Sequence, residues 1–362
     1  MTLGRTYPEQ YSQQLDQKAD QLKTQFADLQ PPALEVYASK PEHFRMRAEF
    51  RIWHEGEQSF YSMHDPEQPG KPVQIDDFPI ASKLINGHMQ PLLDAVCGQQ
   101  ILRHRLFQVE FLSTQSGELL ITLLYHKRLD DAWIEAATEL RAQLGVDLIG
   151  RARKQKICLH RDFVDETLSV AGQPYHYQQV ENSFTQPNAG VCEKMLEWAL
   201  ESTRGAQGDL LELYCGNANF TVVLAQNFAR VLATEIAKSS VNSAQLNLAR
   251  NNIENVEIVR MSSEEITQAI NKERPFRRLR QIDLDSYNFG TIFVDPPRSG
   301  LDPETEKLVQ RFERVVYISC NPDTLRQNLE TLCKTHRIQR FALFDQFPYS
   351  HHREAGVVLQ RR

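Results

Sequence analysis

The sequence of 362 residues lacks the features that would place a protein in a membrane or send it across one. No apolar run approaches the ~20 residues that a membrane helix needs. The first ten residues, MTLGRTYPEQ, have neither the basic stretch nor the apolar stretch of a secretory signal. We therefore expect a cytoplasmic protein without a membrane anchor.

Cysteine is sparse and scattered. The six cysteines stand at positions 97, 158, 192, 215, 320 and 333, and no two of them form a C-x-x-C pair. Structural zinc and iron–sulfur sites draw on closely spaced cysteines, and a disulfide framework needs an oxidising compartment. The sequence thus predicts no metal, no iron–sulfur cluster and a reducing compartment. A cysteine with a chemical role must owe it to its surroundings.

Positive charge is also in deficit, because 41 lysines and arginines face 47 aspartates and glutamates, for a net charge of −6. A protein that holds nucleic acid mainly by neutralising phosphates is usually basic overall. Nucleic-acid binding would therefore have to come from local basic patches. The length favours two domains, and nothing indicates an obligate protein partner.

The first half of the chain, residues 1–180, has the pattern of an α+β domain. Apolar residues at helical spacing predict an amphipathic helix over 10–29, which Pro31-Pro32 ends. In 45–53 (RMRAEFRIW) apolar and polar residues alternate, which predicts a half-buried strand with three arginines on its polar face. A hairpin over 106–126 and a helix over 132–144 follow.

The second half, residues 181–362, alternates strands with helices. Runs such as TIFV and VVYIS are apolar on both faces, as a parallel strand covered by helices requires. The last two strands have no helix between them, so they should pair antiparallel at one edge. The pattern predicts a doubly wound, Rossmann-like α/β domain with seven strands, at 210–214, 231–235, 256–259, 291–294, 315–319, 339–344 and 356–359.

A turn containing Gly216 follows the first of these strands and indicates a nucleotide-type cofactor. It is not the dinucleotide fingerprint, because Ala218 and Thr221 stand where that motif has its second and third glycines. S-adenosylmethionine carries no phosphate and does not need those glycines. Glu235 ends the second strand, where a carboxylate can accept hydrogen bonds from ribose hydroxyls. From these residues alone, an ordinary turn and a surface glutamate remain an equal alternative.

Two further strand ends carry chemical groups. Asp295 follows one strand directly, and Cys320 follows the next. Pro322 has the position of a first helical residue, with Asn321 as the N-cap. Cys320 would then lie in the positive field of a helix N-terminus, which predicts a lowered thiol pKa. A lone cysteine is more often a small buried hydrophobe, but its place at the ligand edge of the sheet favours a nucleophile.

Five motifs in the same order resemble the RNA 5-methyluridine methyltransferases. They are SFTQPN (183–188), ELYCGNANF (212–220), FVDPPRSG (293–300), YISCNP (317–322) and HHREAG (351–356). RMRAEFRIWH (45–54) and LLYHKRLDD (123–131) resemble the bacterial tRNA (uracil-5-)-methyltransferase branch. The absence of an iron–sulfur cysteine cluster also favours the tRNA branch. The chain departs from the family in having alanine at 218, where glycine is usual, and at 355, where the residue is often larger.

The resemblance implies a class I methyltransferase that takes a methyl group from S-adenosylmethionine to carbon 5 of the T-loop uridine of tRNA, and of the similar arm of tmRNA. It implies Cys320 as the nucleophile that adds to carbon 6, and Glu354 as the proton acceptor. Gln186 and Asp295 also suit the uracil edge, an alternative that the sequence leaves open. The cofactor-binding residues that it implies are Gln186, Tyr214, Asn219, Glu235 and Asp295.

The RNA-facing candidates lie in the first half of the chain, together with the basic run RARKQK (151–156). Phe107 alternates with Val109 and Phe111 like a core residue, so core packing and base stacking are equal alternatives for it. The target base must leave its stack to reach Cys320. The single residues are Arg45, Arg47, Arg51, Phe107 and His126.

Two rival functions remain open. An adenine-amino methyltransferase would also place a Pro-Pro motif after a strand, but its chemistry needs no cysteine nucleophile. A non-catalytic RNA-binding or RNA-folding protein would not need Cys320 and Glu354, although a folding role can accompany catalysis, because flipping a T-loop base requires loosening of the tRNA.

Overall fold

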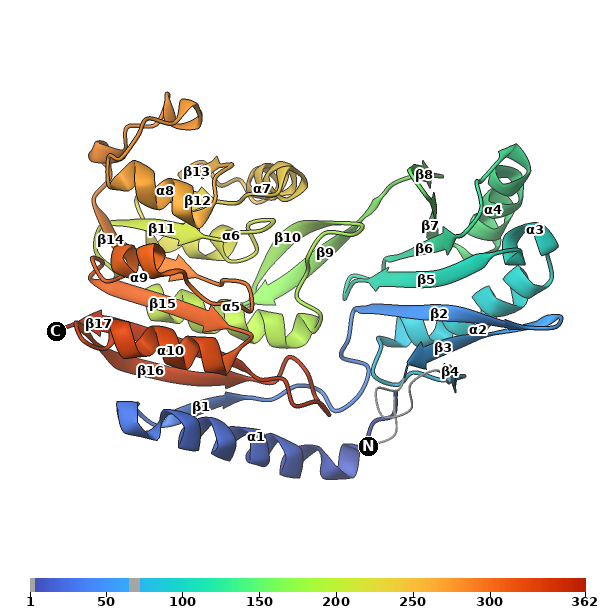
Figure 1. Ribbon diagram of the computed structural model, residues 1–362, viewed down its shortest axis with the longest axis horizontal. Helices are drawn as coiled ribbons and strands as arrows, with labels where there is room; N and C mark the ends of the chain where they lie inside the picture. The colour runs from blue at the N-terminus through green and yellow to red at the C-terminus, as the bar shows by residue number, and fades with distance from the viewer. Residues whose placement is uncertain (1–3, 65–71) are drawn as a thin grey trace. The chain divides into compact units, whose positions relative to one another are not determined.

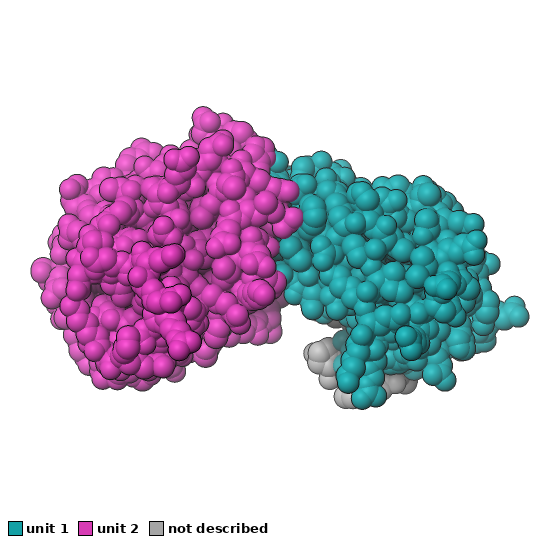
Figure 2. All heavy atoms as spheres, turned by 90° about the horizontal axis from the view of Figure 1, so that it is seen from above, with its two compact units in different colours: residues 1–9, 40–167, 179–189 teal, residues 10–39, 168–178, 190–362 magenta. Residues whose placement is uncertain are grey.

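The computed structural model describes residues 4–64 and 72–362. The chain forms two compact units, shown in different colours in Figure 2. Unit 1 contains the described residues of 1–9, 40–167 and 179–189, and unit 2 contains 10–39, 168–178 and 190–362. The division differs from the single boundary predicted between residues 180 and 181. The physical reason is that the N-terminal helix buries its apolar face in the core of unit 2.

Unit 1 is built on a mixed sheet with the strand order β4-β3-β2-β5-β6-β7-β8. Its pairs are antiparallel except β6 with β7, which are parallel. The predicted hairpin over 106–126 is confirmed as β5 and β6. The strands are β2 (Arg47–Glu55), β3 (Gln58–His64), β4 (Pro72–Ile75), β5 (Leu106–Ser113), β6 (Leu119–Tyr125), β7 (Asp147–Ala152) and β8 (Gln155–Cys158).

Helices α2 (Lys83–Cys97), α3 (Gln100–Arg103) and α4 (Asp131–Leu144) cover one face of this sheet (Figure 1). The alternation in β2 works as predicted, because Ala48, Phe50 and Ile52 are buried in the core between the sheet and these helices. Strands β9 (Phe163–Val170) and β10 (Gln173–Val180) form a separate pair. The opposite face of the sheet has a small apolar cluster of Leu112, Leu120, Ile149 and Val164.

Unit 2 contains, among the described residues, a sheet of eight strands in the order β1-β16-β17-β15-β14-β11-β12-β13. The seven predicted strands and the antiparallel pairing of the last two are confirmed. The strands are β1 (Leu34–Tyr37), β11 (Asp209–Leu213), β12 (Val231–Thr234), β13 (Val256–Val259), β14 (Phe289–Val294), β15 (Arg314–Ser319), β16 (His336–Phe344) and β17 (Glu354–Arg361).

The eighth strand, β1, was not predicted. It pairs in parallel with β16 and forms the edge of the sheet. The prediction that the last two strands lie at this edge is therefore wrong. Its four residues, LEVY, follow two prolines and are too short to show a clear period. Pairing with β16 therefore depends on the tertiary position of α1 (Tyr11–Phe26), which precedes it.

Helices cover both faces of this sheet (Figure 1). One core is formed with α1, α8 (Ser263–Ile270), α9 (Pro303–Val309) and α10 (Pro322–Leu332). On the opposite face lies α5 (Ala189–Thr203), whose Trp198 lies directly against Gly356. The remaining helices are α6 (Thr221–Leu224) and α7 (Lys238–Arg250). The predicted doubly wound α/β fold is confirmed.

Candidate active site

Cys320 lies where β15 ends and α10 begins. Asn321 is the N-cap of α10, its side-chain oxygen accepting a hydrogen bond of 3.2 Å from the backbone N–H of Asp323, and Pro322 is the first helical residue. Both features agree with the sequence. The thiol is half-buried and stands at the carboxyl edge of the sheet, where ligands of doubly wound folds bind.

The strand register brings Glu354 next to this thiol. Strands β15 and β17 run antiparallel with Ser319 paired to Ala355, so the next positions along the two strands are Cys320 and Glu354. Glu354 is 3% exposed. Asp295 follows the neighbouring parallel strand β14 and completes a cluster of three acidic groups. Three residues that are far apart in the sequence therefore meet at one edge.

The electrostatics of this cluster correct one prediction. The pKa of the Cys320 thiol is raised to about 11, chiefly by burial and then by the negative charges of Glu354 and Asp295. Burial also raises the pKa of Asp295 to about 7, and burial and Asp295 raise that of Glu354 well above its usual value. The lowered thiol pKa predicted from the helix N-terminus is wrong, because its partial charge of about half a unit is outweighed by burial and two carboxyl groups.

The cation beside the cluster is Arg298, which the sequence analysis did not single out. Its positive charge lowers the pKa values of Cys320 and Glu354 and so opposes the effects of burial. Its guanidinium donates a hydrogen bond of 3.1 Å to Nδ1 of His352, and its carbonyl accepts one of 2.9 Å from Asn321. The available signal was its position in the PPRSG turn directly after Asp295.

A cavity of about 250 Å³ opens at the same edge of the sheet, after β11, β12, β13 and β14. Two predicted cofactor residues, Tyr214 and Glu235, line it. The Glu235 carboxylate accepts hydrogen bonds from the backbone N–H groups of Gly216 (3.1 Å) and Ala237 (2.7 Å). Ser262 and Ser263, at the start of α8, add hydroxyl groups to the wall and were missed from the sequence.

The other three predicted cofactor residues, Gln186, Asn219 and Asp295, are not among those that line the cavity. The Asn219 side-chain amide lies 3.4 Å from the sulfur of Cys192, and its carbonyl accepts a hydrogen bond of 2.9 Å from the Tyr177 hydroxyl. Asn219 therefore fixes the turn that follows Tyr214. Gln186 is half-buried and belongs to unit 1, so its role stays a prediction.

The turn after β11 has an unusual backbone, which explains the family's preference for glycine at position 218. Tyr214, Gly216 and Ala218 have φ angles of 61°, 57° and 66°, in the left-handed region. A side chain with a Cβ costs roughly 1–2 kcal/mol there. Ala218 is fully buried and keeps this conformation, so the loop shape is retained at the expense of strain.

Buried acid at this edge suits a cationic ligand. Glu212, in β11, is 1% exposed, and among the described residues its Oε2 atom has no hydrogen-bond partner. Burial, with a further effect of Asp295, raises its pKa to about 8. Because S-adenosylmethionine carries a sulfonium and an ammonium group, positive charge close to these carboxyl groups would offset the cost of burying them. The residues present therefore fit this cofactor.

Two kinds of feature are absent from the described ranges, 4–64 and 72–362. No group of three or more histidine, cysteine, aspartate or glutamate residues there could hold a metal ion. No helix in those ranges is long and apolar enough to cross a membrane.

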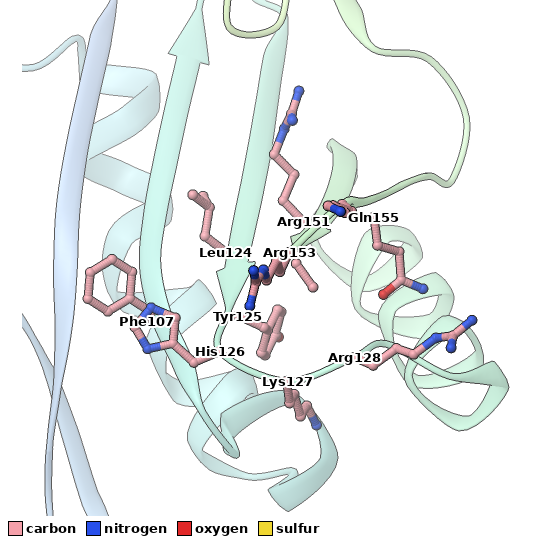
Figure 3. Close-up of a pocket in the computed structure, with 11 residues that line it drawn as sticks. Phe107, Leu124, Tyr125, His126, Lys127, Arg128, Arg151, Arg153 and Gln155 are labelled. Carbon is pink, nitrogen blue, oxygen red and sulfur yellow. The ribbon is translucent and has the colours of Figure 1, made fainter.

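Unit 1 carries a pocket of about 950 Å³ that is lined by cationic and aromatic side chains (Figure 3). Phe107 stacks on His126 with ring centroids 4.2 Å apart, and Arg51 lies over the Phe107 ring at 5.4 Å. Phe107 is half-exposed because an irregularity in the β5–β6 register lies between Leu106 and Gln108. Phe107 is not among the residues of the unit 1 core, which favours base stacking over core packing, and its stacking role stays a prediction.

The other two predicted arginines of this sheet bind the protein's own backbone. The Arg45 Nε atom donates a hydrogen bond of 2.7 Å to the carbonyl of Arg47, and the Arg47 guanidinium donates one of 2.7 Å to the carbonyl of Ser183. Arg47 thus holds the loop on which Gln186 lies. Arg51, by contrast, is exposed.

The basic run 151–156 is likewise divided. Arg151 makes a bidentate ion pair with Glu181, and Lys156 is paired with Asp162 and Glu181. Arg153 and Lys154, at the turn between β7 and β8, are exposed and have no acidic partner in the described part of the chain. Fewer positive charges are therefore available to an anionic partner than the number of basic residues in 151–156 suggests.

Comparisons with known proteins identify the family of this chain. The family model for tRNA (Uracil-5-)-methyltransferase matches residues 10–362. A tRNA/tmRNA (uracil-C(5))-methyltransferase of Vibrio vulnificus strain CMCP6 is 60% identical, over 98% of each chain. The protein of the same name from Shewanella denitrificans is 58% identical over all of both chains.

A solved structure shares the fold. The Pyrococcus abyssi tRNA (uracil-54, C5)-methyltransferase, in complex with S-adenosyl-L-homocysteine, matches with a TM-score of 0.74 at 21% identity, covering 96% of this chain and 83% of that one. At 21% identity this similarity shows the fold alone. The family model and the two relatives show the family, because they match over nearly the whole chain. The chain belongs to the tRNA (uracil-5-)-methyltransferase family.

Proposed function

We propose that this protein transfers a methyl group from S-adenosylmethionine to carbon 5 of the T-loop uridine of tRNA. The observation that carries the proposal is the pairing of a cysteine thiol with a buried carboxyl group at the carboxyl edge of the sheet, where the cavity also opens. Family membership supports the reaction, and the names of the relatives support tRNA and tmRNA as substrates.

The Cys320 thiol activates carbon 5 of the uracil ring. Carbon 5 of uracil is a poor nucleophile, and addition of the Cys320 sulfur to carbon 6 converts the ring to an enolate whose carbon 5 can accept a methyl group. Because the thiol is protonated in the free protein, its proton must leave as the C–S bond forms. We assign this proton to Asp295, since a carboxyl with a pKa of about 7 is matched to accept it at neutral pH.

Glu354 acts on the methylated adduct. Its carboxylate takes the proton from carbon 5, the electrons form the C5=C6 bond, and the cysteine sulfur leaves as the thiolate. A buried carboxyl group with a raised pKa is a stronger base than an exposed one. Arg298 offsets the negative charge that this cluster carries between the two steps.

The cofactor supplies an electrophilic methyl group on its sulfonium. Glu235 and Tyr214 would hold it in the cavity, and Asp295 and Gln186 would contact it or the uracil edge. Asn219 acts less directly, by fixing the turn after β11. No other cofactor is required for the proposed chemistry.

The affinity for S-adenosylmethionine should rise severalfold, up to about tenfold, between about pH 6.5 and about pH 7.5. Glu212, with its pKa of about 8, is mostly protonated in this pH range. The positively charged ligand binds better when Glu212 is a carboxylate. The fraction of protein with Glu212 ionised grows about tenfold over this one pH unit. Calorimetric titration at several pH values measures this. The Glu212→Gln variant should show a flatter dependence, and equal profiles would contradict the assignment.

The RNA surface that we propose is the pocket of unit 1. A stacked Phe107–His126 pair beside Arg51 offers faces for unstacked bases, and Arg153 and Lys154 offer charge for phosphates. Such a surface favours a loop with splayed bases, as in the T arm of tRNA and the similar arm of tmRNA. Holding bases out of their stack would also help tRNA to refold, which we propose as an accompanying activity.

The double substitution Arg153→Gln/Lys154→Gln should weaken tRNA binding and reduce the magnitude of the log–log salt slope of the binding constant by about 1.4–1.8. The reason is that each removed cation no longer neutralises a phosphate, so one fewer counterion is released when tRNA binds. Filter binding at several salt concentrations measures the slope. Lys83→Gln, which removes an exposed cation from the start of α2, is the control and should leave it unchanged. An unchanged slope in the double variant would exclude the β7–β8 turn from the RNA surface.

The function itself is tested by incubating the protein with S-adenosylmethionine and tRNA that lacks 5-methyluridine. Mapping by mass spectrometry should find one new 5-methyluridine, in the T loop. A methylated adenine formed without a covalent RNA intermediate would favour the adenine-amino methyltransferase instead. Binding and refolding of tRNA without any methyl transfer would favour a non-catalytic RNA-folding protein.

A further inference from the structure

Helix α1 contacts the segment that leads to Glu354. The connection between β16 and β17, residues 345–353, ends directly before this glutamate. In α1, Lys18 lies 2.7 Å from the Asp345 carboxylate and donates a second hydrogen bond of 2.7 Å to the carbonyl of Phe347. The side chains of Lys18 and Asp345 are 5% and 1% exposed, so this is a buried ion pair.

Two further residues of α1 contact the same loop. The Gln14 amide group donates a hydrogen bond of 3.1 Å to Asp345, and its oxygen accepts one of 3.3 Å from the backbone N–H of Tyr349. The Tyr11 ring packs edge-on against the ring of Tyr349, with centroids 6.1 Å apart. Three successive turns of one helix side therefore hold the first half of the loop.

The second half of the loop reaches the reacting groups. His352 accepts the hydrogen bond from Arg298, whose charge acts on Cys320 and Glu354. Phe344 and Glu354 are paired across β16 and β17, so Asp345 and Glu354 flank the same end of this hairpin. The position of the base is thus tied to α1 by a chain of contacts that begins at Lys18.

The ion pair is not needed simply to attach the helix. Leu22 and Phe26 are fully buried and already anchor α1, and a buried ion pair rarely stabilises a fold more than an apolar pair of similar size would. What charged and hydrogen-bonded contacts add is direction, since they fix Asp345 and the Phe347 carbonyl at defined points.

We propose that Lys18 and Gln14 are positioning residues for the proton-removal step: through Asp345 they clamp loop 345–353 and so hold Glu354 beside Cys320. The inference rests on the proposed function, because it assigns Glu354 to a step of that reaction. Helix α1 would then position the loop that leads to Glu354, in addition to packing in the core.

The test compares Lys18→Met with Lys23→Met, the same change at an exposed lysine of the same helix. The only ion pair of Lys23 with a described residue is the surface pair with Asp20. Lys18→Met should raise the hydrogen-exchange rates of amides in 345–353 about tenfold and lower kcat by roughly 10–100-fold, since small displacements of a catalytic group are costly. Methylated covalent RNA adduct should accumulate on denaturing gels, while the Kd for S-adenosylhomocysteine stays near the wild-type value. Lys23→Met should match the wild type in all three measurements.

A second variant separates positioning from stability. In Lys18→Met/Asp345→Leu no buried charge is left unpaired, so folding should recover, yet the adduct should still accumulate because the loop has lost its directional contacts. A folded double variant that releases product at the wild-type rate would overturn the proposal, and so would Lys18→Met with unchanged loop exchange. Failure of the proposed function has a different signature, because the wild-type protein would then form no 5-methyluridine while the exchange result stood.

Discussion

Replacing Glu354 by glutamine should halt the enzyme as a methylated covalent RNA adduct, whereas replacing Cys320 by alanine should abolish both adduct and methyl transfer. The cysteine acts first, and without its sulfur carbon 5 is not activated, so turnover should fall by at least about four orders of magnitude. Glu354→Gln leaves the first steps intact but removes the proton acceptor, which should slow turnover by about 10²–10⁴-fold.

The structure explains why Glu354→Gln should fold. Glu354 is buried, and burial together with Asp295 raises its pKa well above the usual value, so this position does not depend on a charged side chain for its packing. A neutral amide of nearly the same shape should therefore cost little stability. A denaturing gel with labelled tRNA and labelled S-adenosylmethionine separates the two variants, because only Glu354→Gln should give a slow band that carries both labels. Wild-type turnover in Glu354→Gln would make Asp295 the next candidate for the base.

Deleting the N-terminal segment should destroy the catalytic unit, although every cofactor motif lies beyond residue 181. By the boundary predicted from the sequence, the fragment 181–362 should keep cofactor binding. The structure leads to the opposite expectation, because Leu22 and Phe26 are fully buried in the core of unit 2 and β1 pairs along β16. We expect the fragment to be unfolded and to bind no S-adenosylmethionine.

A point substitution gives the same test in the whole chain. Phe26→Ala should destabilise unit 2 by about 3–5 kcal/mol, since the ring is fully buried and lies 5.2 Å from that of Phe341. Lys23→Ala, on the exposed side of α1, should change stability by less than about 0.5 kcal/mol. Denaturant unfolding, monitored with cofactor binding, measures both. A fragment 181–362 that folds and binds the cofactor would show that α1 and β1 are dispensable.

The sequence alone determined most of the fold of this protein and singled out the two groups that we propose to react. Periodicity is a local property, so the alternation in 45–53 and the apolar runs TIFV and VVYIS were sufficient to predict strands of the right kind. Motif order was sufficient to single out Cys320 and Glu354 and to indicate the family. Asn321 and Pro322 were placed correctly because capping depends on neighbouring residues.

What only the tertiary structure decided depends on residues that are distant in the chain. The pKa of Cys320 is raised chiefly because the fold buries the thiol, and further because strand pairing places two buried carboxyl groups beside it; no local pattern contains that information. The same holds for Arg298, for the unmatched oxygen of Glu212 and for the contact between Lys18 and Asp345, which are 327 residues apart. Burial and charge act through space, so the sequence could name the groups that we propose to react, while the fold shifts their pKa values and holds them in place.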